Sequence, residues 1–230
     1  MKRKELQEER EEWRRQEFRR CILRAAEKVI VAKGYSAMTM DDVAREAQFS
    51  KATLYHYFRS KGGLLLEILG NFFEEIDQEV QKINRLRLNA REKLRKGIHF
   101  YLRFYEDKEN ISRMIIMDPS FTEKMNIFVA DERKLTSEVD RRFITKMKTK
   151  RKDILNGVSK ILEEGMASGE FRKMDVAGAV TFLESLLQGY CHVRFWHDRP
   201  YSAKEATEII QDIFLHGIEK KDGTVKGASR

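Results

Sequence analysis

The segment from Thr39 to Lys61 reads TMDDVAREAQFSKATLYHYFRSK and predicts two short helices joined by a tight turn. Thr39 and Asp42 have the spacing of a capping box, which starts the first helix. Ser50 suits the N-cap of the second helix, where its hydroxyl accepts a hydrogen bond from the backbone N–H of Thr53. Two helices joined by so few residues form a helix-turn-helix, whose second helix can enter the major groove of DNA.

The second helix of this motif has an apolar face and an aromatic face. Leu54 and Phe58 are four residues apart and face the core, whereas Ala52, Tyr55 and His56 fall on the opposite side. A surface helix does not normally expose aromatic rings beside lysine unless something binds there. The alternative is that the tyrosines pack in a small core.

The chemistry of these side chains suits DNA. A small residue at position 52 lets the helix approach base edges, and the aromatic side chains can donate to phosphates or touch base edges and thymine methyls. Lys61 lies in the first turn of the next helix, which Ser60 caps, so a phosphate would meet an ammonium and a helix N-terminus. The candidate DNA-binding residues are Thr39, Ser50, Lys51, Ala52, Thr53, Tyr55, His56, Tyr57 and Lys61.

The segment resembles the DNA-binding domain of the TetR family of transcriptional regulators, over residues 18–69. The matching elements are Lys33-Gly34-Tyr35, Thr39, Ala47-Gln48-Phe49-Ser50, Leu54-Tyr55-His56-Tyr57-Phe58 and Lys61. The sequence departs from the family pattern at Gln48 and at the pair Gly62-Gly63. Gln48 replaces the usual glycine and is expected to take a left-handed turn conformation. Gly62 and Gly63 weaken the first turn of the fourth helix by roughly 1 kcal/mol each.

The resemblance implies a ligand-responsive DNA-binding regulator, most often a repressor, and not an enzyme. It implies a homodimer that binds a palindromic double-stranded operator and is released by a small-molecule effector. The expected domains are a charged N-terminal arm (1–16), a helix-turn-helix domain (17–64), an effector-binding and dimerisation domain (65–220) and a disordered tail (221–230). Whether the output is repression or activation is left open by the sequence.

The composition independently predicts an all-α protein. The chain has 230 residues and only two prolines, it is rich in Leu, Glu, Lys, Arg, Met and Ala, and strand-like alternation is hard to find. The net charge of +8 fits a polyanionic partner such as DNA.

The two cysteines, Cys21 and Cys191, do not make a disulfide framework, so a reducing cytosol is expected. Histidine and cysteine spacings indicate no metal site, and we expect no cofactor. The charged N-terminus lacks the apolar core of a signal peptide, and no apolar run approaches the roughly 20 residues of a membrane span. We therefore expect a cytoplasmic protein with no membrane partner.

Apolar periodicity and capping residues predict the remaining helices. The expected helices are 18–33, 61–87, 90–107, 110–117, 132–166 with a break near Thr149, 175–196 and 202–218. Gly34 ends the first of these, and Ser202 caps the last with Glu205 three residues on. Residues 121–129 are expected to form a short helix or an irregular turn. For residues 1–16 a solvated, fraying arm is favoured over an extension of the first helix.

In the family that this chain resembles, the last two helices pair with those of a second subunit. The stripes on these helices therefore give the candidate dimer interface, which is Val180, Leu183, Leu187, Tyr190, Ile209, Ile213 and Phe214. The alternative is that these stripes cover the core of one subunit, and both can hold on different faces.

The resemblance also implies an effector site, which we expect in the aromatic and Met-rich middle of the chain. The candidates are Phe100, Tyr101, Phe104, Tyr105, Met114, Met117, Phe121, Met125, Phe128, Phe143 and Met147. An ordinary helical core is the alternative for each residue taken singly. The favoured effector is a lipophilic or aromatic molecule.

Two other classes of function compete with a regulator. An enzyme is disfavoured because the sequence has no nucleophile elbow, metal motif or glycine-rich phosphate loop. A non-specific architectural nucleic-acid-binding protein would share the basic charge, but it would lack an effector pocket and show little sequence preference.

Overall fold

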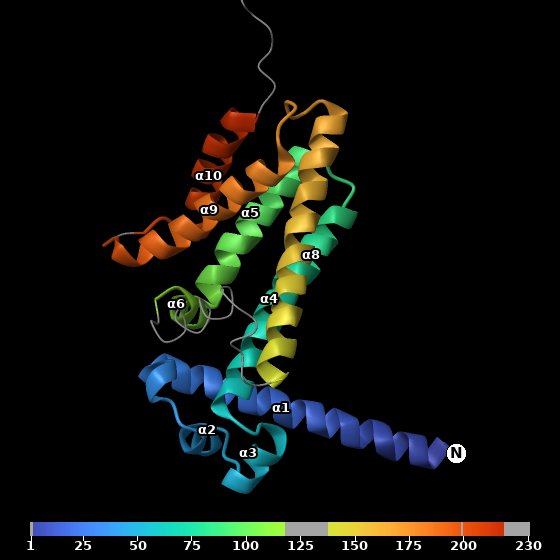
Figure 1. Ribbon diagram of the computed structural model, residues 1–230, viewed down its shortest axis with the longest axis vertical. Coiled ribbons are helices and arrows are strands. Elements are labelled where there is room, and N and C mark those ends of the chain that lie inside the picture. Colours follow the sequence, from blue (N-terminus) through green and yellow to red (C-terminus); the bar gives the residue numbers. More distant parts are fainter. Residues whose placement is uncertain (1, 118–137, 199, 219–230) are drawn as a thin grey trace, which may run out of the picture. The chain divides into compact units, whose positions relative to one another are not determined.

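The computed structural model describes residues 2–117, 138–198 and 200–218 (Figure 1), and within them every regular element is helical. The elements are α1 (Lys2–Ala37), α2 (Met40–Glu46), α3 (Lys51–Tyr57), α4 (Lys61–Arg85), α5 (Ala90–Asp107), α6 (Glu109–Met117), α8 (Glu138–Ser168), α9 (Val176–Val193), the 3-10 helix η2 (Arg194–Trp196) and α10 (Ala203–Ile218). The all-α expectation is confirmed. None of the described helices is both long and apolar enough to cross a membrane.

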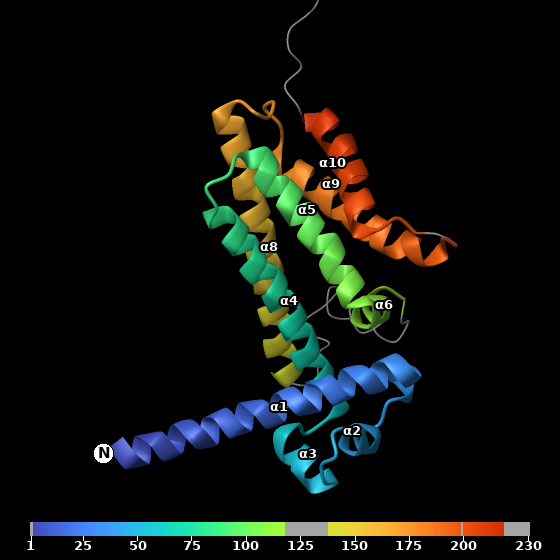
Figure 2. The ribbon, with the colours of Figure 1, turned by 180° about the vertical axis from the view of Figure 1, so that it is seen from behind.

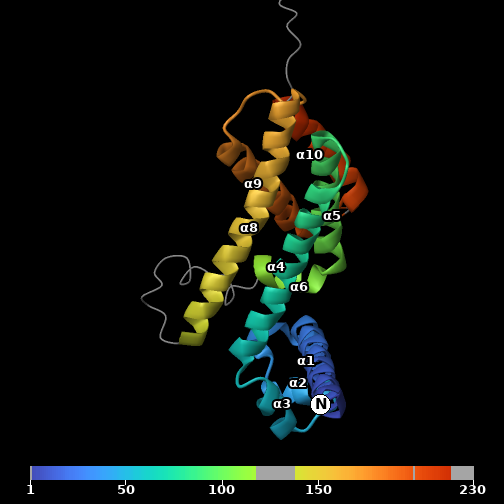
Figure 3. The ribbon, with the colours of Figure 1, turned by 90° about the vertical axis from the view of Figure 1, so that its right-hand side faces the viewer.

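The chain forms two compact units. The first contains residues 1–72 and 108–146, and the second contains residues 73–107 and 147–230. Helix α4 therefore contributes its first half to one unit and its second half to the other. In the first unit, α2 and α3 lie beside α1, drawn in blue and cyan in Figure 3, and α6 packs against α1.

The core of the first unit is built where α1, α2, α3 and α4 meet. Ile22 of α1, Val43 of α2, Leu54 of α3 and Leu64 of α4 are fully buried. Each belongs to an apolar face whose residues recur every three or four positions. Short helices such as α2 and α3 are marginal in isolation and become stable when these faces pack together.

Helix α1 begins much earlier than expected. Residues 2–16 are helical and not a separate arm, and their described side chains are exposed. The segment has no proline or glycine and carries pairs such as Gln16 with Glu12, which support a helix along one face. Gly34 interrupts the helix with a φ of 77°, as expected from its position.

In the second unit, α4, α5, α8, α9 and α10 pack around one apolar core. Figure 2 shows α9 and α10 beside α5, and α8 alongside α4. Buried residues include Val80 on α4, Ile98 on α5, Leu162 on α8 and Leu183 on α9. A Cβ added at Gly157 of α8 would clash with the side chain of Val80, so this glycine sets the close approach of the two helices.

The expected break of α8 near Thr149 is wrong, because the helix runs on through this point. Lys150, next to this point, pairs with two carboxylates on α4. The Lys150 ammonium lies 2.9 Å from Asp77 Oδ2 and 3.0 Å from a carboxylate oxygen of Glu74. The hydrogen bonds that Lys150 donates, first to Asp77 and then to Glu74, raise the pKa of Lys150 above its usual range.

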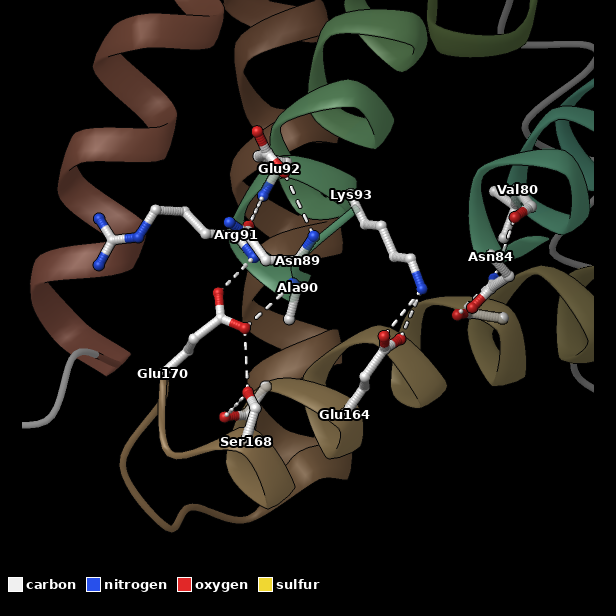
Figure 4. A network of polar contacts seen from close by, with 12 residues as sticks. Val80, Asn84, Asn89, Ala90, Arg91, Glu92, Lys93, Glu164, Ser168 and Glu170 are labelled. Atoms are coloured by element: carbon white, nitrogen blue, oxygen red, sulfur yellow. Dashed lines mark hydrogen bonds and ion pairs between the residues drawn. The ribbon is translucent and has the colours of Figure 1, made fainter. Parts of the chain in front are cut away.

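A polar network joins the start of α5 to the end of α8 (Figure 4). The Glu170 carboxylate accepts from the backbone N–H groups of Ala90 and Arg91 at 3.3 and 3.2 Å, which caps the free donors at the start of α5. Lys93 is buried, and its ammonium donates to both carboxylate oxygens of Glu164 at 2.9 and 2.8 Å. The first contact caps α5, and the second compensates the buried charge of Lys93.

Candidate nucleic-acid interface and ligand cavity

The capping box expected at the start of α2 is present. Thr39 Oγ1 accepts from the backbone N–H of Asp42 at 3.1 Å, and the Asp42 carboxylate accepts from the backbone N–H of Thr39 at 3.2 Å. The hydrogen bond from Lys33, followed by that from the Thr39 hydroxyl, lowers the pKa of Asp42 to about 2. The box fixes where α2 begins and therefore how it presents α3.

The turn between α2 and α3 depends on one left-handed residue. Gln48 has a φ of 58° and is the one non-glycine residue of the described chain with positive φ. The backbone N–H of Phe49 then donates to the carbonyl of Ala44 at 2.9 Å and closes the corner. The left-handed conformation expected for Gln48 is confirmed.

Helix α3 begins at the expected cap. Ser50 Oγ accepts from the backbone N–H of Thr53 at 3.0 Å, and the hydroxyls of Ser50 and Thr53 lie 2.8 Å apart. Leu54 is buried against the core. The opposite face, with Ala52, Tyr55 and His56, is exposed, and 42% of Tyr55 is accessible. This face has the donors and the small residue that contact with a DNA groove requires.

Tyr57 has a different environment from Tyr55. It is half-buried, and its ring lies 6.1 Å from that of Phe18 and 5.3 Å from that of His56. Phe18 also contacts Phe49, at 5.1 Å between ring centroids. Tyr57 therefore packs partly in the small core that the sequence left as an alternative.

The two candidate lysines are engaged within the protein. Lys51 Nζ donates to Asp41 Oδ2 at 3.0 Å, and this hydrogen bond raises the pKa of Lys51. Lys61 Nζ donates to the carbonyl oxygen of Ser36 at 2.9 Å and lies 4.4 Å from the centroid of the Tyr35 ring. Neither pairing was foreseen, because each joins two elements whose relative angle is a tertiary property.

A small apolar cavity lies inside the second unit. Its volume is about 70 Å³, and its walls come from α4, α5, α8 and α9. Phe100 and Tyr101 of the predicted pocket line it, together with aliphatic residues that the prediction missed, such as Ile76, Val80 and Ile154. For Ile76 and Val80 the available signal was the apolar stripe of α4, but such a stripe is equally typical of an ordinary core.

The other predicted pocket residues are scattered. Phe104 and Tyr105 are buried beside the cavity, where Tyr105 stacks on Tyr101 at 4.5 Å. Burial raises the pKa of Tyr105 to about 12, so its hydroxyl stays neutral. Met147 is buried on α8, but Met114 belongs to the first unit. Phe121, Met125 and Phe128 lie outside the described residues, as do the side chains of Met117 and Phe143.

The predicted dimer residues fall into two sets. Val180, Leu183, Leu187 and Phe214 are buried within one subunit, Tyr190 is half-buried, and Ile209 and Ile213 are exposed. A further exposed set was missed, namely Phe182, Leu186 and Val193 on α9. Because α9 is apolar on two faces, the sequence alone does not tell which stripe turns inward.

Metal chemistry finds no support in the described part of the chain, where no group of three His, Cys, Asp or Glu side chains is placed to hold a metal ion.

Comparison with known proteins gives matches over both parts of the chain. Residues 22–68 match the model of the bacterial regulatory proteins of the tetR family, and residues 89–220 match that of the C-terminal region of QacR-like proteins.

The HTH-type transcriptional activator FasR of Mycolicibacterium smegmatis is 33% identical over 109 residues, which are 47% of this chain and 50% of that protein. The fatty acid metabolism regulator protein of Bacillus subtilis is 22% identical over 87% of this chain and 95% of its own length. The crystal structure of FadR from Bacillus subtilis in complex with stearoyl-CoA has a TM-score of 0.68 and 20% identity over 86% of this chain and 98% of that chain.

Proposed function

The chain belongs to the TetR family of bacterial regulatory proteins, and from this premise we propose that it is a repressor that binds a palindromic operator as a homodimer and is released by a lipophilic effector. Members of this family are DNA-binding transcriptional regulators and not enzymes. The observation that carries the proposal is the exposed aromatic face of α3, held by the caps at Thr39 and Ser50.

A dimer is needed because one helix-turn-helix contacts few bases. Two helix-turn-helix domains related by a two-fold axis contact two half-sites spaced by whole helical turns. The exposed apolar residues of α9 and α10 support such a pairing, with Phe182 71% and Ile213 59% exposed. A Cβ at Gly189 of α9 would meet open space, so this position allows a second helix to approach closely.

The effector is proposed to enter the apolar cavity. A cavity of about 150 Å³ holds one benzene molecule, so the present volume of about 70 Å³ must grow before a larger ligand fits. Growth displaces wall residues such as Ile76 and Val80 of α4, and α4 also supplies buried residues to the first unit. Effector binding thereby favours a conformation in which the two α3 helices no longer fit both half-sites.

The similarity to the fatty acid metabolism regulator protein of Bacillus subtilis, and to the FadR structure in complex with stearoyl-CoA, supports a fatty acyl effector. The same comparisons include a regulator named as an activator, FasR. The direction of regulation is tested by a reporter gene behind the operator. Higher reporter expression on deletion of the regulator supports repression, whereas lower expression contradicts it.

The operator is found by selecting duplexes from a random-sequence pool. We expect a palindromic consensus bound by two protomers, and Tyr55→Ala should weaken its binding roughly tenfold through lost base contacts. Tyr201→Ala removes a tyrosine outside α3 that is more exposed than Tyr55 and should leave binding unchanged. A pool without a consensus would support the architectural alternative.

A further inference from the structure

A large basic groove lies on the second unit, outside the predicted effector pocket. Its volume is about 900 Å³, and its walls come from the end of α4, the connection to α5, the outer side of α5 and the start of α10. Five cationic residues line it, Lys82, Arg95, Lys96, Arg103 and Lys204. A groove of this size is in the range of sites for drug-sized ligands.

Three of these cations have no ionic partner among the described residues. Lys82 pairs with Glu79, and Arg103 pairs with Asp107. Arg95, Lys96 and Lys204, in contrast, make no ion pair within the described part of the chain.

The groove lining contains three carboxylates, which balance only part of the charge of its five cationic side chains. Glu79 is occupied by Lys82, and Glu92 accepts from the backbone N–H of Asn89 as part of a helix cap. Glu208 is the third acidic side chain in the lining. The groove therefore has surplus positive charge from side chains that repel one another, and a multiply charged anion relieves this repulsion.

The floor of the groove is apolar. Ile83, Leu86, Leu88 and Phe100 line it. Ile83 and Phe100 also line the interior cavity, so these two side chains form a wall common to the groove and the cavity. Phe100 is half-exposed, and its ring stacks on that of Phe104 at 5.4 Å.

We propose that the groove binds the phosphate-bearing head of an amphiphile whose hydrocarbon tail passes Phe100 into the interior cavity. The proposal rests on the lipophilic effector of the proposed function and adds the chemical class of its head group. Arg95 is suited to bidentate contact with a phosphate, while Lys96 and Lys204 contribute compact charges. The apolar cavity alone would not discriminate between a free fatty acid and an amphiphile that has the same hydrocarbon tail and a phosphate-bearing head.

Binding of four probes to the full-length protein by calorimetry tests this assignment. The probes are palmitoyl-coenzyme A, palmitoyl lysophosphatidic acid, palmitate and coenzyme A. We expect both phosphate-bearing amphiphiles to bind more tightly than palmitate, by about tenfold or more. The first two probes distinguish a nucleotide thioester from a phospholipid as the natural source of the head.

The matched variants are Arg95→Glu/Lys96→Glu and, as a control, Arg172→Glu/Lys173→Glu, which changes two exposed basic residues outside the groove. The groove variant should lose about tenfold or more in affinity for the phosphate-bearing amphiphiles and keep its affinity for palmitate. The control should bind all probes as the unmodified protein does. Equal losses in the two variants, or no preference for the phosphate-bearing probes, would overturn the groove assignment.

The same titrations, repeated with operator DNA present, separate this assignment from the proposed function. If palmitate alone releases the DNA and the groove variant responds normally, the groove assignment fails and the lipophilic effector stands. If palmitoyl-coenzyme A binds in the groove but the DNA is never released, the effector role fails and the groove site stands.

Discussion

The ammonium of Lys51 lies 3.0 Å from a carboxylate oxygen of Asp41, so the first residue of α3 is paired with the first turn of α2. Both side chains are more than half exposed, at 61% and 55%. An exposed ion pair of this kind contributes little to stability. Its consequence is for DNA binding, since a phosphate that approaches Lys51 competes with Asp41.

Replacing Asp41 with Asn should therefore tighten DNA binding, because Lys51 is then free for a phosphate and a repelling carboxylate is gone. Lys51→Ala should weaken binding to all sequences alike and reduce the slope of log affinity against log salt by about one. Fluorescence anisotropy over a salt series measures both. Glu163→Gln, an exposed carboxylate on α8, is the control, and an unchanged slope in Lys51→Ala would remove Lys51 from the interface.

Gln48→Gly should stabilise the protein. The left-handed φ of 58° is strained for a residue with a Cβ, by roughly 1–2 kcal/mol, and the extra freedom of glycine in the unfolded chain offsets about half of this. We expect a gain of about 0.5 kcal/mol in the free energy of unfolding, measured with urea. Gln48→Val should lose stability, and a loss in Gln48→Gly as well would show that the Gln48 side chain has a stabilising contact.

The carboxyl of Asp42 should give a pH-dependent contribution to stability. Its pKa falls from 3.8 to about 2 on folding because Lys33 and Thr39 donate to it. A lowered pKa stabilises the folded protein above the unfolded value, and this contribution is lost as the pH falls through the folded value. Asp42→Asn should therefore be less stable than the unmodified protein near neutral pH, and the difference should shrink below about pH 4. A difference independent of pH would contradict this.

The buried ammonium of Lys93 depends on Glu164. Glu164→Ala leaves this charge without its partner, and we expect a loss of about 1–3 kcal/mol in the free energy of unfolding. Lys93→Met, of similar shape and without charge, should be nearly neutral. Chemical denaturation measures both changes. Glu163→Ala, which removes the adjacent carboxylate outside this ion pair, is the control. Equal stability of Glu164→Ala and Glu163→Ala would mean that water replaces the carboxylate.

The exposed apolar faces of α9 and α10 should hold the dimer together. Phe182→Glu or Ile213→Glu places a charge on this surface and should give monomers in sedimentation velocity. Operator affinity should fall, because each helix-turn-helix domain then binds its half-site singly. The folded monomer should keep its circular dichroism. Lys152→Glu, exposed on α8, should stay dimeric. Dimers in both apolar variants would place the interface elsewhere.

Local features of this fold were predictable, whereas contacts between elements were not. The caps at Ser50 and Ser202 depend on residues three positions away, so the sequence contains all that decides them. The pairing of Lys61 with Tyr35 depends on how α4 meets the end of α1. A search for aromatic and Met side chains likewise finds only Phe100 and Tyr101 of the cavity wall, because most of the wall consists of ordinary aliphatic residues such as Ile154.

The most direct test of the central claim is binding of the purified protein to the DNA upstream of its own gene, by fluorescence anisotropy across a salt series. A dimeric operator reader should bind one site tightly with two protomers, bind random DNA far more weakly, and lose affinity steeply with salt. Equal affinity for the upstream DNA and random DNA, together with no palindromic consensus from the selected pool, would contradict it.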